Sequence, residues 1–297
     1  MERIVHVCNS DSTADTLSLA DLPGEIRVWG DTLDQGPLLA VGDAEHYKAR
    51  GGTADETQRL ADWDKGFDEA ARAEELILWF EADISSQFAL ARLLSRLSRR
   101  GLPKTLTIVS IDRHPDVPNF VGLAQLKPEQ LAELWARRTP LSRDAIDEAI
   151  TTWIALTSAD PRALPFLMRR VKALPYLAGA IERHLEELPD PTSGMSRTER
   201  QLLAAVARGE TNLKASVQAT DPRYPITDSL LSHTLATFDQ LGFTAGTAVT
   251  ALGRQALAGS IDRVHEYGID TWRGAVHLTG RGPVWRWESR ERRLIEK

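Results

Sequence analysis

The stretch Val5-His6-Val7-Cys8-Asn9-Ser10-Asp11-Ser12-Thr13 decides the fold class of this chain. Its apolar residues end abruptly in four small polar ones, and a helical pattern then follows at Ala14, Leu17, Leu19 and Ala20. Small polar residues suit the passage from a strand to a helix, because the first amides of a helix need hydrogen-bond acceptors. The stretch therefore predicts the first strand and helix of an α/β domain.

The same format recurs three times along the first part of the chain. Strands are predicted at 25–29, 75–80 and 105–111, each followed by an acidic residue and separated by Gly and Pro breaks or helical patterns. Residues 41–72 are polar and helix-prone, with Gly51-Gly52 as an interruption. The run at 75–80 is almost continuously apolar, as buried parallel strands require. Residues 1–125 are thus predicted to form a doubly wound, mostly parallel sheet of the flavodoxin or Rossmann type.

Two further parts are predicted beyond this α/β domain. Residues 126–194 are mostly helical and end in a linker at 189–194, where Pro, Asp, Thr, Ser and Gly gather. Residues 195–297 open with a capping box formed by Ser196 and Glu199. Three helices and then a strand near 243–249 are typical of a winged-helix domain, and 276–278 with 284–288 alternate as the two strands of a hairpin do.

Composition bounds the class of protein. The chain has 297 residues, one cysteine and no apolar run near the ~20 residues that span a bilayer, so we expect a cytoplasmic protein that does not enter a membrane. The net charge is −6, but residues 195–297 hold 14 Lys and Arg against 11 Asp and Glu, which leaves −9 on residues 1–194. An acidic first part binds polyanions poorly, and +3 on the last part is a weak signal for DNA.

Polar residues follow the four predicted strands at their carboxyl ends, where open parallel sheets bind ligands. Asp34 and Asp83 are among them, beside the residues to which we assign roles. The expected catalytic residues are Asp11, Glu81, Asp112 and His114; the expected ligand-binding residues are Asn9, Ser12, Asp31, Gln87, Arg113 and, from the C-terminal part, His277; and the expected metal ligands are Asp11, Glu81 and Asp83.

Carboxylates that converge in this way repel one another and raise at least one pKa, unless a cation neutralises them. The cluster therefore favours a divalent metal such as magnesium, or a ligand rich in hydroxyls or amines. A simpler interpretation is that Asp11, Ser12 and Asp83 cap helices. Ser12 with His114 as its base, by analogy with serine esterases, is a weaker interpretation. Cys8 ends a strand and is expected in the core, and no Gly-rich phosphate loop, zinc spacing or nicotinamide fingerprint is present.

Several motifs together resemble the bacterial family named domain of unknown function 1835. They are the stretch 6–13, Val28-Trp29-Gly30-Asp31 with Gln35-Gly36-Pro37, Leu78-Trp79-Phe80-Glu81-Ala82-Asp83 with Gln87, residues 122–126, residues 196–200, residues 268–278 and Trp285-Arg286-Trp287. The resemblance covers nearly the whole chain. The family usually has Gly where Ser10 stands, Arg where Gly30 stands and Asp where Ser86 stands. It implies no particular reaction.

Two functions from different classes remain open. The first is an enzyme, a hydrolase or group transferase, that binds a small polar or phosphorylated ligand at the strand ends. The second is a ligand-responsive regulator that binds DNA or a protein through the winged helix. A third use of that helix, as a lid or a homodimer contact, ranks above DNA binding because Lys and Arg are absent between residues 226 and 253.

Overall fold

The computed structural model describes residues 3–33, 36–40, 42–221, 224 and 226–297. Its N-terminal half is built on five strands in the order β2-β1-β3-β4-β5, the order of doubly wound sheets of the flavodoxin type. The first four strands are parallel: β1 (Ile4–Cys8), β2 (Glu25–Val28), β3 (Glu75–Trp79) and β4 (Thr105–Val109). The edge strand β5 (Thr139–Pro140) is antiparallel to β4. The predicted mostly parallel sheet is confirmed, and it takes its last strand from beyond residue 125.

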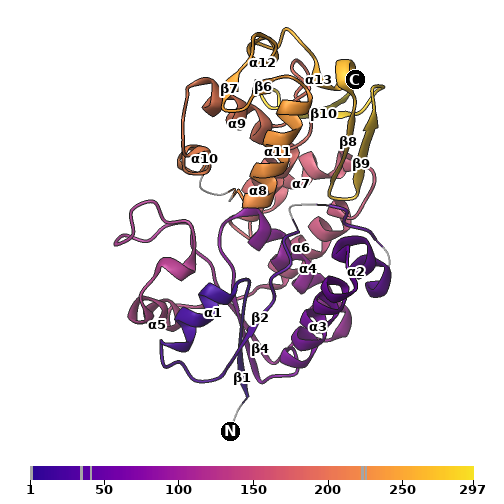
Figure 1. Ribbon diagram of the computed structural model, residues 1–297. Helices are drawn as coiled ribbons and strands as arrows, with labels where there is room; N and C mark the ends of the chain where they lie inside the picture. Colours follow the sequence, from indigo (N-terminus) through magenta and orange to yellow (C-terminus); the bar gives the residue numbers. More distant parts are fainter. Residues whose placement is uncertain (1–2, 34–35, 41, 222–223, 225) are drawn as a thin grey trace.

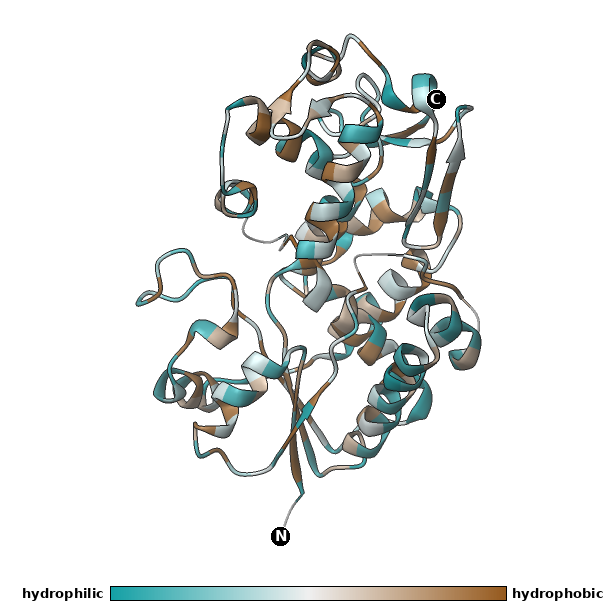
Figure 2. Cartoon of the chain, in the orientation of Figure 1, coloured by the Kyte–Doolittle hydropathy of each residue, from teal (hydrophilic) through white to brown (hydrophobic). Residues whose placement is uncertain are grey.

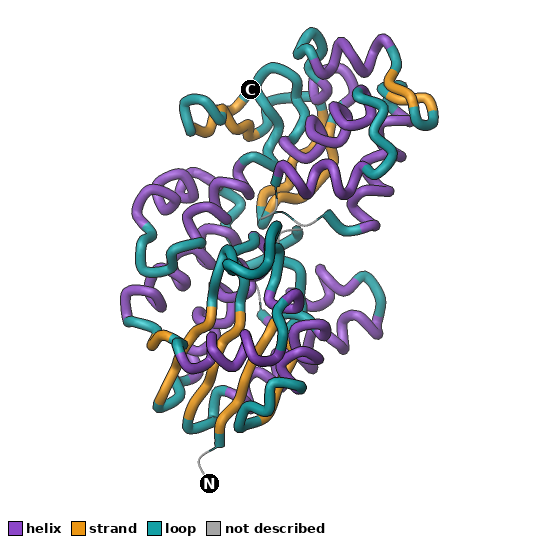
Figure 3. Tube along the Cα trace, turned by 90° about the vertical axis from the view of Figure 1, so that its left-hand side faces the viewer, coloured by secondary structure: helices purple, strands orange, loops and turns teal. Residues whose placement is uncertain are grey.

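Successive side chains of each strand point to opposite faces of this sheet. Helices cover both faces, so the apolar side chains on each face are buried. Val5, Val7, Leu76 and Leu78 face one hydrophobic cluster, with α3 (Ala54–Ala70), α4 (Ile84–Arg100) and α6 (Arg143–Leu156). Cys8, Ile77 and Trp79 face a second cluster, with α1 (Asp11–Ser18) and α5 (Pro128–Ala136). Figures 1 and 3 show the sheet between these two helical layers. Cys8 is in the core, as expected.

The polar segment after β2 forms α2 (Asp43–Gly51) and α3, with the break at Gly51-Gly52 as predicted. A Cβ on Gly51 would lie 2.5 Å from Thr57 Oγ1, so only glycine fits where the two helices meet. Both helices are largely hydrophilic in Figure 2, in contrast to the brown strands of the sheet. They lie at the outside of the sheet, with a narrow apolar stripe facing inward.

A buried charge cluster joins α3 to α4. The carboxylate of Asp64, which is 1% exposed, accepts hydrogen bonds from Trp29 Nε1 (2.9 Å), Tyr47 Oη (2.5 Å), Arg92 (2.5 Å) and Arg96 (3.1 Å). A carboxylate can accept about four hydrogen bonds, so Asp64 is fully satisfied. The directional hydrogen bonds from Arg92 and Arg96 of α4 to Asp64 of α3 therefore fix how the two helices lie against each other.

The helical middle part continues the same core into the C-terminal half. The helices α6 and α8 (Leu177–Leu185) pack against α4, and α7 (Leu164–Arg170) packs against α6 and α8. Short 3-10 turns lie at η1 (Leu123–Gln125), which contacts α1, and at η2 (Pro161–Ala163). The predicted linker at 189–194 is a packed turn. Asp190 Oδ1 accepts from the amides of Thr192 (2.8 Å) and Ser193 (2.9 Å), and the backbone N of Trp287 donates to Pro189 O at 3.1 Å.

The C-terminal part contains three helices and then a short hairpin. These are α9 (Arg197–Ala207), α10 (Leu213–Thr220), α11 (Asp228–Gln240) and the strands β6 (Thr244–Ala245) and β7 (Ala248–Val249). The predicted capping box is confirmed, since Ser196 Oγ accepts from Glu199 N at 3.2 Å and Ser196 N donates to Glu199 Oε2 at 2.8 Å. The helices α12 (Ala251–Leu257) and α13 (Arg263–Tyr267) follow.

The final strands pair differently from the prediction. The two segments expected to pair with each other belong to separate hairpins: β9 (Val276–Gly280) pairs with β8 (Ile269–Arg273), and β10 (Trp285–Glu288) pairs with β11 (Arg293–Glu296). The strands β8 and β9 are joined by only two residues, 274 and 275, and such a tight turn favours their pairing. Among the described helices, none is long and apolar enough to cross a membrane.

Candidate functional site

The candidate site lies where β1 and β3 end side by side. The chain leaves β1 into α1 on one face of the sheet and leaves β3 into α4 on the other face. In doubly wound sheets, ligands usually bind at such a point, where the direction of winding reverses, in a crevice at the carboxyl edge. Asn9 follows β1, and Glu81, Asp83 and Gln87 follow β3, so the structure brings these four predicted residues to one place.

The hydroxyl of Ser86, in the first turn of α4, joins three of these side chains. Asn9 Nδ2 donates to Ser86 Oγ at 2.5 Å. Ser86 Oγ lies 2.5 Å from Asp83 Oδ2 and 3.2 Å from Glu81 Oε2. Asp83 is also the N-cap of α4, with its Oδ1 accepting from Ser86 N at 3.0 Å. Ser86 is fully buried, so these side chains are the polar environment that the described residues give it.

The single hydrogen of the Ser86 hydroxyl limits how the carboxyl groups of this cluster can be ionised. A serine hydroxyl has one hydrogen to donate and two lone pairs. Ser86 donates to Asp83, the nearer carboxylate, and accepts from Asn9, so its remaining lone pair suits a proton on Glu81. Burial, followed by the charge of Asp83, raises the pKa of Glu81 to about 7. Burial also raises the pKa of Asp83. Glu81 is therefore a carboxyl group that can gain or lose its proton near neutral pH.

A loop after β4 covers Glu81. Leu123 N donates to Glu81 Oε1 at 3.0 Å, and a Cβ on the preceding Gly122 would lie 3.4 Å from the same oxygen. Leu123 is fully buried in the second hydrophobic cluster. A Cβ at this distance would be in ordinary van der Waals contact, so it is the Leu123 amide that holds this oxygen of Glu81 in place.

One acceptor of the cluster is left unused. Asn9 Oδ1 is buried and has no hydrogen-bond donor among the described residues. A buried acceptor without a donor costs roughly 1–3 kcal/mol. The crevice is therefore short of donors, which a ligand hydroxyl or amine would supply.

The predicted metal ligands are not assembled into a metal site. Asp11 is exposed on α1, whereas Glu81 and Asp83 face Ser86. All four oxygens of Glu81 and Asp83 already contact Ser86 or Leu123. Within the described ranges, no group of three His, Cys, Asp or Glu side chains could hold a metal ion. These residues do not fit magnesium, which requires near-ideal octahedral oxygen ligation.

The residues predicted near the start of α1 have other positions. The N-cap is Ser10, whose Oγ accepts from Thr13 N at 3.2 Å, so the interpretation of Ser12 as the cap is wrong. Asp11 and Ser12 are exposed residues of the first turn. Ser12 Oγ contacts Ser10 Oγ at 3.2 Å and shares no hydrogen bond with His114 among the described residues, so the structure gives the esterase-like pair no contact.

The predicted residues of the neighbouring strand ends do not join the cluster either. After β2, Asp31 forms a bidentate pair with Arg50 of α2, in which Nη2 lies 2.7 Å and Nε 3.0 Å from the carboxylate oxygens. After β4, Asp112 and Arg113 are exposed and pair with each other at 3.3 Å. His114 Nδ1 accepts from Asp116 N at 3.3 Å. Asp34 and Gln35 lie outside the described residues.

His277 lies in the C-terminal hairpin. Its ring stacks on Trp272 with the centroids 4.3 Å apart, and its Nε2 lies 2.7 Å from Asp270 Oδ1. The turn of this hairpin does reach the N-terminal half, because Leu38 N donates to Gly274 O at 3.0 Å. The contact is made by the backbone at Gly274, with the His277 ring engaged by Trp272 and Asp270.

Gln87 links the cluster to a cavity between α4 and the start of α6. Its Nε2 donates to Glu81 O at 2.7 Å, and its side chain also lines a cavity of about 130 Å³ together with Ser110, Ser142 and Tyr176. Ser110 Oγ is buried without a described partner. Leu90, Ala145 and Leu174 supply the apolar part of the lining. Apolar walls with a few polar groups are typical of small-molecule sites.

The sequence interpretation missed two side chains of the candidate site, Ser86 and Ser110. Ser86 stands three residues after the N-cap Asp83, a position at which a side chain turns back to the cap, and this spacing was the available signal. Ser110 follows directly on β4, as the predicted residues do on their own strands.

Scanned against models of known protein families, the chain matches none, and a search of curated proteins also gives no match.

Proposed function

We propose that the protein is an enzyme, a hydrolase or group transferase, that binds a small polar ligand at the carboxyl ends of β1 and β3. The observation that carries this proposal is the convergence of Asn9, Glu81 and Asp83 on Ser86 at the reversal point of the sheet. Two neighbouring carboxyl groups, one protonated and one ionised, are a common arrangement for general acid–base chemistry. In this proposal Glu81 transfers the proton, and Asp83 with Ser86 holds it in position.

The charge of the crevice favours a particular class of ligand. Its unused group is an acceptor, Asn9 Oδ1, and the carboxyl groups of Glu81 and Asp83 share the Ser86 hydroxyl with Asn9. A ligand that donates hydrogen bonds, such as a polyol or an amine, supplies what is missing. A phosphorylated ligand would meet like charge, and Arg113, the base predicted to bind the ligand, is exposed and paired with Asp112. We therefore place polyols and amines ahead of phosphate esters.

A thermal-shift panel of polyols, amines and phosphate esters tests this proposal. The wild type is compared with Glu81→Gln, Asn9→Leu and Asp11→Asn, and with the exposed control Glu25→Gln at the opposite edge of the sheet. A hit should raise the melting temperature of the wild type and of Glu25→Gln, and much less that of Asn9→Leu. If every ligand-dependent shift survives in Glu81→Gln, Asn9→Leu and Asp11→Asn, the site is elsewhere and the proposal is wrong.

The C-terminal part also bears on the alternative of a DNA-binding regulator. We propose that α9, α10, α11 and the β6–β7 hairpin form a winged-helix-like unit that packs as a lid or a dimer contact. A recognition helix needs bases on its free face. The helix α11 contains no Lys or Arg, and its His233 and Thr237 line a pocket shared with β8. Nothing in this geometry favours DNA as a partner, and sedimentation of the full chain tests the homodimer.

Membership of the family named domain of unknown function 1835 likewise remains a proposal. It is supported by the motifs at the strand ends, since 6–13 and 78–87 are the segments that build the crevice. Shared crevice residues in purified members of that family, with the same ligand preference, would support it.

A further inference from the structure

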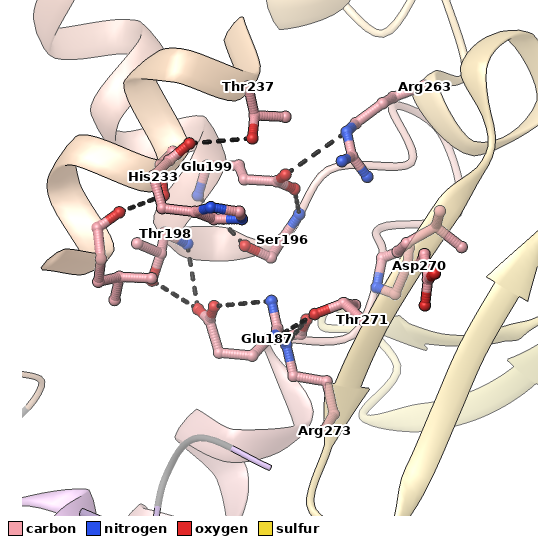
Figure 4. Close-up of a pocket in the computed structure, with 14 residues that line it drawn as sticks. Glu187, Ser196, Thr198, Glu199, His233, Thr237, Arg263, Asp270, Thr271 and Arg273 are labelled. Atoms are coloured by element: carbon pink, nitrogen blue, oxygen red, sulfur yellow. Dashed lines mark hydrogen bonds and ion pairs between the residues drawn. The ribbon is translucent and has the colours of Figure 1, made fainter. Parts of the chain in front are cut away.

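A second polar pocket lies in the C-terminal part, away from the sheet edge. It has a volume of about 110 Å³ and is enclosed by the start of α9, by α11, by β8 and by the segment after α8 (Figure 4). The side chains that matter are Glu187, Ser196, Glu199, His233, Arg263 and Thr271. They come from five separate segments, so the pocket exists only in the folded chain.

Arg263 is the unusual member of this lining. Its side chain is only 11% exposed, and its Nε lies 3.5 Å from Glu199 Oε1, an ion pair without a hydrogen bond. Its Nε and Nη1 are buried and have no acceptor among the residues that the structure describes. A guanidinium has five N–H donors, and leaving buried ones unmade is costly. Figure 4 shows the group directed toward Glu199 at the edge of the pocket.

The other charged groups of the pocket already have partners. Glu187 Oε1 accepts from Thr198 N (3.1 Å) and from Arg183 (2.6 Å). Arg273 Nε donates to the backbone oxygen of Glu187 at 2.9 Å. Glu199 Oε2 accepts from Ser196 N in the capping box at 2.8 Å. Asp270, which also lines the pocket, lies 2.7 Å from His277 Nε2. Among the charged lining residues, the buried groups left without a described partner are therefore the N–H donors of Arg263.

Hydroxyl groups add further donors. Ser196 Oγ accepts from Glu199 N at 3.2 Å, and Thr271 Oγ1 accepts from Arg273 Nη1 at 3.1 Å. Neither hydroxyl donates to another described residue. Because a hydroxyl that only accepts keeps its hydrogen, both can donate to a ligand. The pocket thus combines a guanidinium with neutral donors.

We propose that this pocket binds a small, singly charged carboxylate, with Arg263 as its anchor and Ser196 and Thr271 as further donors. The planar fork of a guanidinium matches a carboxylate. The pocket, at about 110 Å³, is much smaller than the roughly 300–1,000 Å³ of sites for drug-sized ligands, so the ligand is small. Glu199 repels a doubly charged phosphate more strongly than a monoanion.

Isothermal titration of the full chain with sodium acetate and sodium propionate tests the proposal. Neutral acetamide and sodium phosphate serve as comparison ligands. The variants are Arg263→Met, Arg263→Lys and Thr271→Val, with Arg254→Met as a control that removes one exposed charge from the neighbouring helix α12. Melting curves show which variants fold, and Arg263→Lys replaces Arg263→Met if the latter does not.

Saturable binding of acetate or propionate is expected, with no binding of acetamide. Arg263→Met should weaken it at least about tenfold, the usual effect of losing a charged hydrogen-bond partner. Arg263→Lys, which lacks the fork, should bind several-fold more weakly than the wild type, as should Thr271→Val, and Arg254→Met should bind as the wild type does. Absence of saturable carboxylate binding, equal binding by Arg263→Met and Arg254→Met, or tighter binding of phosphate would each overturn the proposal.

Discussion

A single hydroxyl, that of Ser86, sets the properties of the crevice at the residue scale. It lies within hydrogen-bond distance of Asn9, Glu81 and Asp83, and it has one proton to give. Ionising Glu81 would place a second acceptor against a hydroxyl that already donates to Asp83. The protonation of Glu81 is therefore tied to the position of its neighbours.

The raised pKa of Glu81 predicts a pH dependence of stability. Between its ordinary value of about 4.5 and about 7, the folded chain binds more protons than the unfolded chain, so the free energy of unfolding falls as the pH rises. Above pH 7 this contribution is lost; it amounts to about 3 kcal/mol, because each tenfold change in proton affinity corresponds to about 1.4 kcal/mol. Glu81→Gln keeps both hydrogen bonds of the protonated acid, so it should be the more stable protein at pH 8.

Urea unfolding of both proteins at pH 5 and pH 8 measures this effect. The two proteins should have similar unfolding free energies at pH 5. The exposed control Glu25→Gln should follow the wild type between the two pH values. A wild type and a Glu81→Gln variant that lose the same free energy between pH 5 and pH 8 would contradict the prediction.

Ser86→Ala should destabilise the protein by about 1–3 kcal/mol, because Asn9 and Asp83 would each lose a buried partner. Ser98→Ala is the matched control on the same helix, where the hydroxyl is exposed and donates to Ser95 O at 2.8 Å. It should change the free energy of unfolding by no more than about 0.5 kcal/mol. Equal losses in the two variants, measured by urea unfolding, would argue against a buried hub at Ser86.

Helices α3 and α4 illustrate what is decided at the scale of elements. The sequence predicts helical segments at both places, but their contact depends on Asp64, which pairs with Arg92 and Arg96 of the second helix. A carboxylate and two guanidinium groups removed from water stabilise the fold only as a complete set. The cluster therefore specifies how the two helices pack.

Asp64→Ala should cost about 3–5 kcal/mol, because it leaves the buried Arg92 and Arg96 without their shared acceptor. The control is Asp62→Ala on the same helix, whose carboxylate is exposed and accepts only from Gln58 among the described residues. Its effect should stay within about 0.5 kcal/mol. Chemical unfolding of the two variants measures the difference, and a loss below about 1 kcal/mol in Asp64→Ala would contradict the prediction.

Element positions could be predicted from sequence because they depend on neighbouring residues. The strand at 75–80, the break at Gly51-Gly52 and the capping box at Ser196 all follow from local patterns, and the structure confirms them. Local patterns could not predict which of two nearby residues caps a helix, or which of two nearby strands pairs with a third. Ser10 and Ser12 are equally good caps by residue type, and only the backbone turn selects Ser10. The pairing of the last strands likewise depends on turns rather than on alternation.

The candidate site could be predicted only in part, because its assembly depends on contacts between segments that are far apart in the sequence. The acids at four strand ends look equivalent in sequence, but they separate once their partners are in place. Asp31 is taken by Arg50 of the following helix, whereas Glu81 and Asp83 meet Asn9 across neighbouring strands. Which acids converge depends on strand order and on the face to which each helix turns.

At the scale of the whole molecule, the two halves share a hydrophobic core and are joined by backbone hydrogen bonds at residues 274 and 275, which we call the clasp. The turn of the β8–β9 hairpin lies against the loop after β2: Gly274 O accepts from Leu38 N at 3.0 Å, and Ala275 N donates to Leu156 O at 3.0 Å. A Cβ on Gly274 would lie 2.8 Å from Leu156 O, at a φ of +60°. Glycine is required here both by the contact and by the left-handed backbone.

Gly274→Ala should therefore cost at least about 1–2 kcal/mol from backbone conformation alone, with the close contact in addition. Gly282→Ala, at the far end of the same hairpin, meets no atom within 4 Å and serves as the control. Thermal unfolding should show a lower melting temperature for Gly274→Ala only. Equal melting temperatures for the two variants would show that the clasp contributes nothing.

The same clasp has a consequence for how the protein is made. Leu38 leaves the ribosome more than 200 residues before Gly274, and at about 5–20 residues per second this delay lasts roughly 10–50 s. During that interval the sheet can form, but the loop after β2 has no partner for its amide. Newly synthesised chains should thus remain open to proteases at this loop until the β8–β9 hairpin has left the ribosome and can accept from the Leu38 amide.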